Sequence, residues 1–117
     1  MIREENIASF GDRPTPFYLY DMQALSNTID YAKNAADKYG FHLHYALKAN
    51  SNTPILNLIK EKGLGADCVS GGEVKKALEV GFHPDRIAFA GVGKTDDEIR
   101  LAIEYNIFTI NVESIEE

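Results

Sequence analysis

Short apolar segments alternate with longer amphipathic segments along most of the 117-residue chain. The apolar segments have the length of β-strands, and the segments between them carry helix-start and helix-stop signals. Successive strands are roughly 20–25 residues apart, a spacing typical of right-handed βαβ units with a parallel sheet. The sequence therefore predicts an α/β fold with strands at residues 41–47, 65–69, 86–90 and 107–112.

Capping residues mark where the predicted helices begin. Asp21 is expected to N-cap a helix over 22–39 that ends at Gly40, and Thr53 precedes Pro54 at the start of the next helix. A serine or threonine followed three residues later by glutamate is a capping box. This pattern predicts further helix starts at Ser70-Gly71-Gly72-Glu73, Thr95-Asp96-Asp97-Glu98 and Ser114-Ile115-Glu116-Glu117.

Chain length limits the number of βα units. A (β/α)8 barrel needs about 250 residues, and this chain supplies roughly half of that. We therefore expect the N-terminal half of a (β/α)8 TIM-type barrel with parallel strands, truncated at a helix start. Residues 1–16 look irregular and residues 17–20 read as a short strand, so the predicted division is an N-terminal segment over 1–21 and a half-barrel over 22–117.

Charge and composition argue against several classes of function. The formal net charge is −6 and no basic run is present, which argues against a nucleic-acid-binding surface. No stretch approaches the roughly 18 apolar residues of a membrane span, and the charged N-terminus lacks the apolar region of a secretory signal. Cys68 is the only cysteine, and its expected place is a buried strand position. These features are typical of a cytoplasmic protein.

The run from His44 to Asn50 contains a short apolar strand that ends in Lys48. By strand alternation, His44, Ala46 and Lys48 share one face, and Lys48 lies at the C-terminal end, where barrel active sites are found. A sheltered lysine amine can lose its proton and attack an aldehyde as a nucleophile. A lysine that only extends its ammonium into solvent explains the pattern equally well.

Asp67 is the second candidate, on the predicted strand 65–69. If its face points inward, Asp67 lies one strand over from Lys48, where a carboxylate can bind a cofactor or hold a protonated amine. From spacing alone, a structural hydrogen-bond network is slightly favoured. Glu73 is better explained as a helix cap than as a third member of the site.

Two other sets of residues carry weaker signals. His42, His44 and His83 have no metal-ligand spacing, so no metal site is predicted, although an inward His44 is a candidate to tune Lys48. The stretch Gly91-Val92-Gly93-Lys94 lacks the full Walker spacing. It is predicted to be a loop after a strand.

Five stretches in register resemble a known family. The run Tyr45-Ala46-Leu47-Lys48-Ala49-Asn50 resembles the lysine motif of the pyridoxal-phosphate decarboxylases with an alanine-racemase-like barrel. The others are similar, in order and spacing, to the diaminopimelate decarboxylases of that group. They are Thr15-Pro16-Phe17-Tyr18-Leu19-Tyr20-Asp21, Gly65-Ala66-Asp67-Cys68-Val69-Ser70-Gly71-Gly72-Glu73, Ala90-Gly91-Val92-Gly93-Lys94-Thr95 and Asn111-Val112-Glu113-Ser114.

The resemblance implies a cofactor and a reaction. Pyridoxal 5'-phosphate would be held by Lys48 as a Schiff base, with Asp67 and Ala46 in the cofactor pocket. The reaction would be decarboxylation of meso-2,6-diaminopimelate to L-lysine. The alternatives are another basic amino-acid decarboxylase of the same fold, acting on ornithine, arginine or carboxynorspermidine, and a non-catalytic pyridoxal-phosphate-binding protein.

The same resemblance implies more than this chain provides. Family members have eight barrel strands and a further β domain, and two subunits complete each active site. We therefore expect the parent protein to be a homodimer with a shared active site. We also expect the 117-residue chain alone to have no useful decarboxylase activity.

Overall fold

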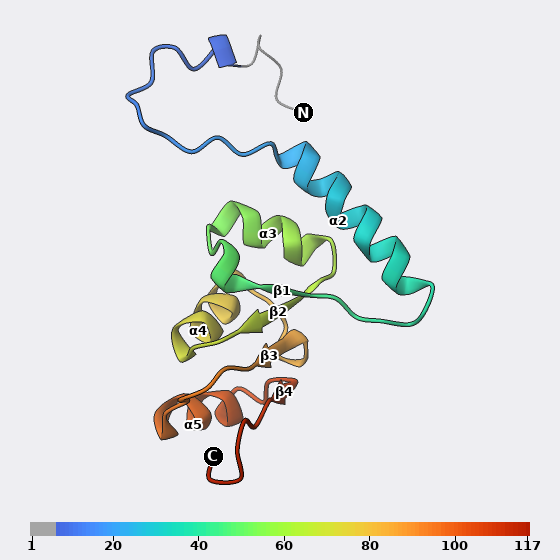
Figure 1. Cartoon of the computed structure of the whole chain (residues 1–117), viewed down its shortest axis with the longest axis vertical. Helices are drawn as coiled ribbons and strands as arrows, with labels where there is room; N and C mark the ends of the chain where they lie inside the picture. Colours follow the sequence, from blue (N-terminus) through green and yellow to red (C-terminus); the bar gives the residue numbers. More distant parts are fainter. Residues whose placement is uncertain (1–6) are drawn as a thin grey trace.

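The computed structural model describes residues 7–117, which contain four short strands in one parallel sheet (Figure 1). The strands are paired in chain order, and each consecutive pair is parallel. The α/β fold with parallel strands is therefore confirmed, and four strands are half the number in a (β/α)8 barrel. The strands are β1 (His44–Ala46), β2 (Gly65–Cys68), β3 (Ile87–Phe89) and β4 (Thr109–Ile110).

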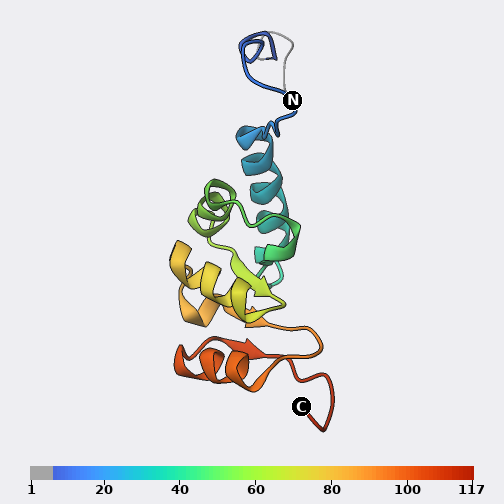
Figure 2. The same ribbon diagram turned by 90° about the vertical axis from the view of Figure 1, so that its left-hand side faces the viewer.

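Helices connect the strands and lie against one face of the sheet. The connecting helices are α3 (Thr53–Glu61), α4 (Gly71–Val80) and α5 (Asp96–Glu104), and Figure 2 shows them stacked on the same side. Helix α2 (Met22–Asp37) precedes the sheet and packs beside α3. Two 3₁₀ turns, η1 (Leu47–Ala49) and η2 (Pro84–Arg86), adjoin the strands.

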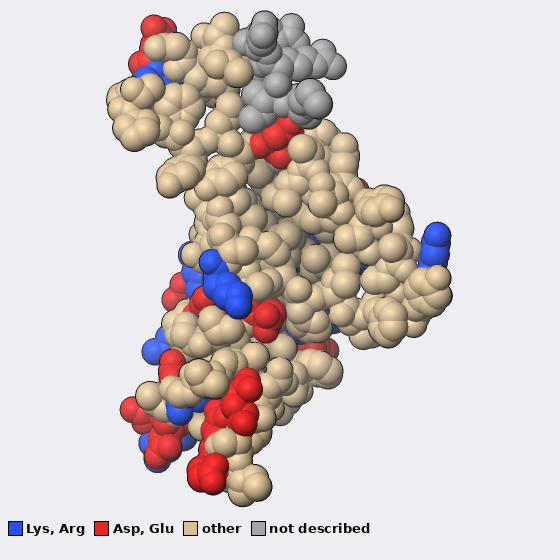
Figure 3. Space-filling view, in the orientation of Figure 1, with Lys and Arg blue, Asp and Glu red and all other residues tan. Residues whose placement is uncertain are grey.

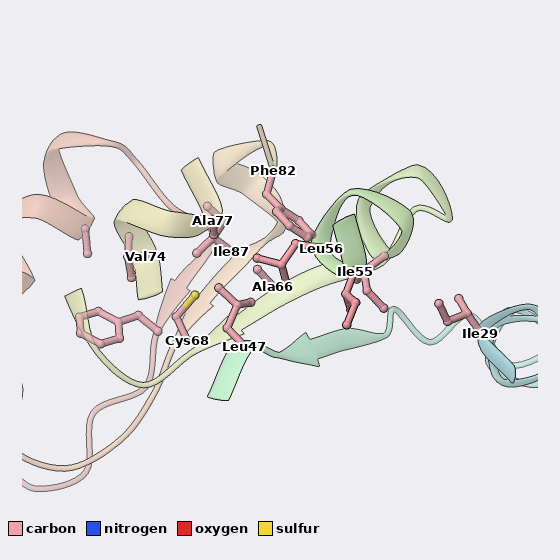
Figure 4. Close-up of a cluster of buried hydrophobic side chains, with 13 residues drawn as sticks. Ile29, Leu47, Ile55, Leu56, Ala66, Cys68, Val74, Ala77, Phe82 and Ile87 are labelled. Carbon is pink, nitrogen blue, oxygen red and sulfur yellow. The ribbon is translucent and has the colours of Figure 1, made fainter. Parts of the chain in front are cut away.

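The hydrophobic core lies between the sheet and these helices (Figure 4). Ala66 and Cys68 of β2, and Ile87 and Phe89 of β3, have no exposed surface. Burying each large apolar side chain contributes roughly 1.5–3 kcal/mol. Cys68 is thus the buried strand residue that was expected, and burial raises the pKa of its thiol to about 12. The helix side of the core is formed by Ile55, Leu56, Ile59, Val74, Ala77 and Ala102.

Most predicted helix starts are confirmed. An Asp21 carboxylate oxygen accepts the Ala24 N–H at 2.8 Å, and Thr95 forms both bonds of a capping box with Glu98. Helix α3 begins one residue earlier than expected, with Asn52 at the N-cap position but without a side-chain cap bond, and α2 ends at Asp37 instead of residue 39. Helix boundaries are the part of a sequence prediction that shifts most easily, because end turns fray.

The capping box expected at Ser70 is only half formed. The Ser70 hydroxyl accepts the Glu73 N–H at 3.2 Å, as predicted. The Glu73 carboxylate accepts the N–H of Val69 at 2.7 Å instead of the N–H of Ser70. Glu73 therefore stabilises the turn between β2 and α4, which agrees with a structural role.

The strand expected at residues 17–20 is absent from the described structure. These residues are extended but pair with no other strand among residues 7–117. Aromatic residues favour strands only where a neighbouring strand offers hydrogen bonds and packing. Of the segment expected to be irregular, Ile7 and Ala8 are helical, and residues 1–6 lie outside the described residues. The division into 1–21 and 22–117 stays a prediction.

Basic and acidic side chains are interspersed on the face drawn in Figure 3. Acidic side chains gather toward the lower end, where α5 and the C-terminal residues lie. Within residues 7–117, no helix is both long and apolar enough to cross a bilayer. Within the same residues, no three His, Cys, Asp or Glu side chains are grouped so as to hold a metal ion.

Candidate functional site

Lys48 lies in the 3₁₀ turn η1, directly after β1. The prediction that the strand continues through residue 47 is wrong, because the backbone turns at Leu47. The alternation argument therefore fails for Lys48 itself, but its position after the C-terminal end of β1 is confirmed. Leu47 is 1% exposed and anchors the turn in the core, whereas Lys48 is exposed. Among residues 7–117, the Lys48 ammonium has no hydrogen-bond or ion-pair partner.

Hydrogen bonds to Asn50 hold the other end of this turn. The Tyr45 hydroxyl donates to the Asn50 carbonyl at 3.2 Å, and the Asn52 N–H donates to the Asn50 side-chain oxygen at 3.0 Å. The Asn50 side-chain amide in turn donates to the Tyr20 hydroxyl at 3.0 Å. Burial raises the pKa of Tyr45, which keeps its hydroxyl protonated as a donor. The turn that carries Lys48 is therefore fixed on both sides.

Asp67 lies on the strand next to Lys48, as predicted. It is aligned with Ala46 of β1 and Ala88 of β3. Its neighbours Ala66 and Cys68 point into the helix-covered core, so alternation directs the half-buried Asp67 to the opposite face. The turn η1 packs beside β2. Asp67 and Lys48 are therefore near one another, although no ion pair between them is present among the described residues.

His44 lies at the start of β1, on the same face of the sheet as Asp67. Its ring lies over Gly65, where a Cβ would fall on the imidazole and within 2.6 Å of the Arg86 carbonyl oxygen. The ring also stacks on Phe108, with centroids 6.1 Å apart. The Nε2 atom of His44 is buried and has no partner within residues 7–117. His44 therefore points away from the helices, as expected, but it packs at the opposite end of β1 from Lys48.

Lys94 is a buried lysine that sequence reasoning missed. Residues 91–94 form the predicted loop after β3, and the Lys94 side chain is 1% exposed. Its ammonium donates to the carbonyls of Gly91 and Asn111 and to the Glu117 carboxylate, at 2.6–2.7 Å. All three donors are used, so Lys94 holds the loops after β3 and β4 together. Its acceptors are backbone carbonyls and a distant glutamate, so no local sequence pattern reveals this role.

Lys48 after β1 and Asp67 in β2 fit an aldehyde cofactor. Lys48 offers an amine that has no partner among residues 7–117, and Asp67 offers a half-buried carboxylate on the neighbouring strand. Asp67 is flanked by the small side chains of Ala46 and Ala88, its partners on the neighbouring strands. An amine, an acid and a flat apolar surface suit a planar ring that carries an aldehyde and a basic nitrogen.

Comparison with known proteins agrees with this chemistry. The family model described as "Pyridoxal-dependent decarboxylase, pyridoxal binding domain" matches residues 24–117. The chain belongs to this family. The matched residues include the whole of the sheet and its connecting helices, so the part of the family present here is its pyridoxal-binding domain.

Several curated relatives are similar over almost the whole chain. A diaminopimelate decarboxylase from Bacteroides thetaiotaomicron is 50% identical over 112 residues, which are 95% of this chain and 29% of the relative. One from Helicobacter pylori is 48% identical over 92% of this chain and 27% of its own length. The chain thus spans less than a third of the length of these relatives.

Solved structures share the fold. A mutant diaminopimelate decarboxylase from Helicobacter pylori complexed with L-lysine superimposes with a TM-score of 0.82 and 46% identity, over 92% of this chain and 27% of that one. The arginine decarboxylase of Paramecium bursaria Chlorella virus gives the same TM-score at 27% identity, over 94% and 29% of the two chains. The barrel half inferred from chain length therefore matches the fold of known decarboxylases.

Proposed function

We propose that this chain is the cofactor-binding part of a diaminopimelate decarboxylase, which converts meso-2,6-diaminopimelate to L-lysine. The observation that carries the proposal is the Lys48 amine at the C-terminal end of β1, which has no partner among residues 7–117 and lies beside the strand that bears Asp67. Relatives 41–50% identical that are named diaminopimelate decarboxylase support the substrate. A similar structure that is complexed with L-lysine, the product of this reaction, supports it further.

Each candidate residue has a separate role in this proposal. The Lys48 amine would hold pyridoxal 5'-phosphate through its aldehyde. The Asp67 carboxylate would stabilise positive charge on the bound groups. Ala46 would provide part of the apolar lining of the cofactor site. When bound, the cofactor supplies an electron sink for the electrons left behind as carbon dioxide departs.

The proposal concerns the whole protein and not this chain alone. The chain spans less than a third of its relatives, so the remaining contacts to substrate are expected from elsewhere. We expect the isolated chain to have no useful decarboxylase activity. The parent is proposed to be a cytoplasmic homodimer whose subunits share each active site.

Borohydride trapping tests the role of Lys48. The whole protein is incubated with pyridoxal 5'-phosphate, reduced, digested and mapped by mass spectrometry. We expect the reduced adduct on Lys48, and we expect Lys48→Ala to lower decarboxylation by at least about 100-fold. Lys38→Ala is the matched control, because Lys38 is also exposed but lies at the end of α2. An adduct that is absent from Lys48 would overturn the proposal.

A substrate panel tests the choice of amino acid. Release of carbon dioxide is compared for meso-diaminopimelate, L-ornithine and L-arginine. The structural similarity to a viral arginine decarboxylase makes arginine the relevant competitor. Preference for meso-diaminopimelate supports the proposal, and preference for arginine or ornithine replaces the substrate. An adduct on Lys48 without any decarboxylation would indicate a pyridoxal-phosphate-binding protein instead.

A further inference from the structure

Asn50 contacts three separate segments of the chain. Its carbonyl accepts a hydrogen bond from the Tyr45 hydroxyl of β1, and its side-chain oxygen accepts the N–H of Asn52, the residue directly before α3. Its side-chain amide donates to the Tyr20 hydroxyl in the extended segment before α2. One residue therefore joins the strand before Lys48, the helix after Lys48 and the N-terminal segment.

The position of Asn50 determines the path of the chain after Lys48. Asn50 is extended, with φ −167° and ψ 114°, and so ends the 3₁₀ turn. The bond from the Asn52 N–H to its side chain spans two residues, as in an Asx turn, and directs the chain into α3. With Leu47 buried on the other side, the backbone of Lys48 is held between an apolar anchor and a polar one.

Tyr20 extends this network to a segment that the sheet does not hold. Residues 17–20 pair with no strand among the described residues. Tyr20 stacks on Tyr18, which is 89% exposed, and its hydroxyl receives the Asn50 amide across 30 positions of the sequence. A hydrogen bond between segments so far apart in sequence couples the position of the N-terminal segment to the turn that carries Lys48.

We propose that Asn50 is a positioning residue for Lys48, and that Tyr20 acts through Asn50 to present the lysine amine. This inference rests on the proposed function, because it assumes that Lys48 binds the aldehyde. Loss of the Tyr20–Asn50 bond leaves Lys48 and its chemistry intact but lets the turn sample more conformations. The attack of the amine on the aldehyde then starts from the productive geometry less often.

Four variants of the whole protein separate the contacts. Tyr20→Phe removes the hydroxyl that accepts from the Asn50 amide. Asn50→Asp keeps an oxygen for the Asn52 N–H, and the Tyr20 hydroxyl can donate to the new carboxylate instead of accepting from the amide. Asn50→Ala removes both side-chain bonds. Tyr18→Phe is the matched control, because it deletes an exposed tyrosine hydroxyl from the same segment and keeps the ring that stacks on Tyr20.

The readouts are the rate and affinity of adduct formation, not turnover. After mixing with limiting pyridoxal 5'-phosphate, samples are reduced with borohydride at successive times and the Lys48 peptide is quantified. The pH midpoint of the visible absorption band of the bound cofactor is measured alongside. We expect Tyr20→Phe to weaken adduct formation by about 3- to 10-fold and Asn50→Ala to weaken it more. Asn50→Asp should weaken it less than Asn50→Ala, because the contact with Tyr20 is kept with the donor reversed. Tyr18→Phe should match the unsubstituted protein.

The double variant Tyr20→Phe/Asn50→Ala gives the sharpest test. Asn50→Ala already removes the amide that bonds Tyr20, so adding Tyr20→Phe should have no further effect. Additive effects, or a Tyr20→Phe variant that behaves like Tyr18→Phe, would overturn the inference. So would an Asn50→Ala variant that unfolds more easily but forms the Lys48 adduct at the normal rate. If the unsubstituted protein forms no adduct on Lys48, the proposed function itself fails.

Discussion

Two lysines follow strands of the same sheet but lie in opposite environments. Lys48 follows β1, is exposed and has no partner for its ammonium among residues 7–117. Lys94 lies in the loop after β3, is 1% exposed and donates to three acceptors at 2.6–2.7 Å. The position of a lysine after a barrel strand therefore does not decide its role.

The difference lies in what each ammonium can still do. An ammonium has three N–H donors. Lys94 uses all three on two carbonyls and a carboxylate, so its reaction with an aldehyde would require those bonds to break. Within the described part of the chain Lys48 has no such bond to break, and its backbone is fixed by Leu47 and Asn50. The fold thus holds one lysine for structure and leaves the other available for chemistry.

Amine labelling should separate the two lysines by the largest factor. Under native conditions, an amine-reactive ester should modify Lys48 about 100-fold faster than Lys94, which corresponds to a local opening of about 2.7 kcal/mol. Peptide mapping at successive times gives both rates, with exposed Lys38 as the reference. In strong denaturant the rates should converge. Native labelling of Lys94 at the rate of Lys38 would contradict the comparison.

Substitution of Lys94 should destabilise the fold more than substitution of Lys48, although Lys48 is the lysine that should label faster. Lys94→Met removes three hydrogen bonds and leaves the Gly91 and Asn111 carbonyls without this donor. We expect it to lower the free energy of unfolding by about 2 kcal/mol. Lys48→Met should change that free energy by less than about 0.5 kcal/mol, because the side chain is exposed and unpaired. Urea unfolding of both variants measures the difference, and equal losses would remove the distinction.

Sequence reasoning succeeded where the signals are local. Alternating apolar segments predicted the parallel sheet, and the helix starts at Asp21 and Thr95 are set by a side chain bonding a backbone N–H three residues away. The position of Asp67 was also predicted, because successive side chains along a strand point to opposite faces of the sheet. These features depend on contacts within one segment or one strand.

The errors arose where tertiary contacts decide the structure. Leu47 continues the apolar alternation, but it is buried as the anchor of a 3₁₀ turn and not as a strand residue. Residues 17–20 have strand-forming side chains but no neighbouring strand among the described residues. Lys94 and Asn50 each have a partner distant in sequence, Asn111 for Lys94 and Tyr20 for Asn50. Spacing alone therefore leaves the Lys48 interpretations even, and a chemical role for Lys48 stays a prediction that adduct mapping tests.

Acidification should weaken the Lys94 contact and leave Lys48 unaffected. The hydrogen bond from Lys94 is the main cause that lowers the pKa of Glu117 below its ordinary value of 4.5. A carboxyl group with a lowered folded-state pKa stabilises the fold above the unfolded pKa, and this stability is lost as the pH falls through the folded value. The stability difference between the unsubstituted protein and Lys94→Met should therefore be larger at neutral pH than well below pH 4.5.

A matched variant assigns this pH dependence to one carboxylate. In a Glu117→Gln background the Lys94→Met loss should no longer change across the same pH range, because the titrating partner is absent. The Lys48→Met variant should show the same small difference at every pH. The effect of acid is the smallest of the three, because the carbonyls of Gly91 and Asn111 still accept from Lys94 when Glu117 is protonated. A pH-independent loss for Lys94→Met would mean that those two carbonyls alone hold the loops together.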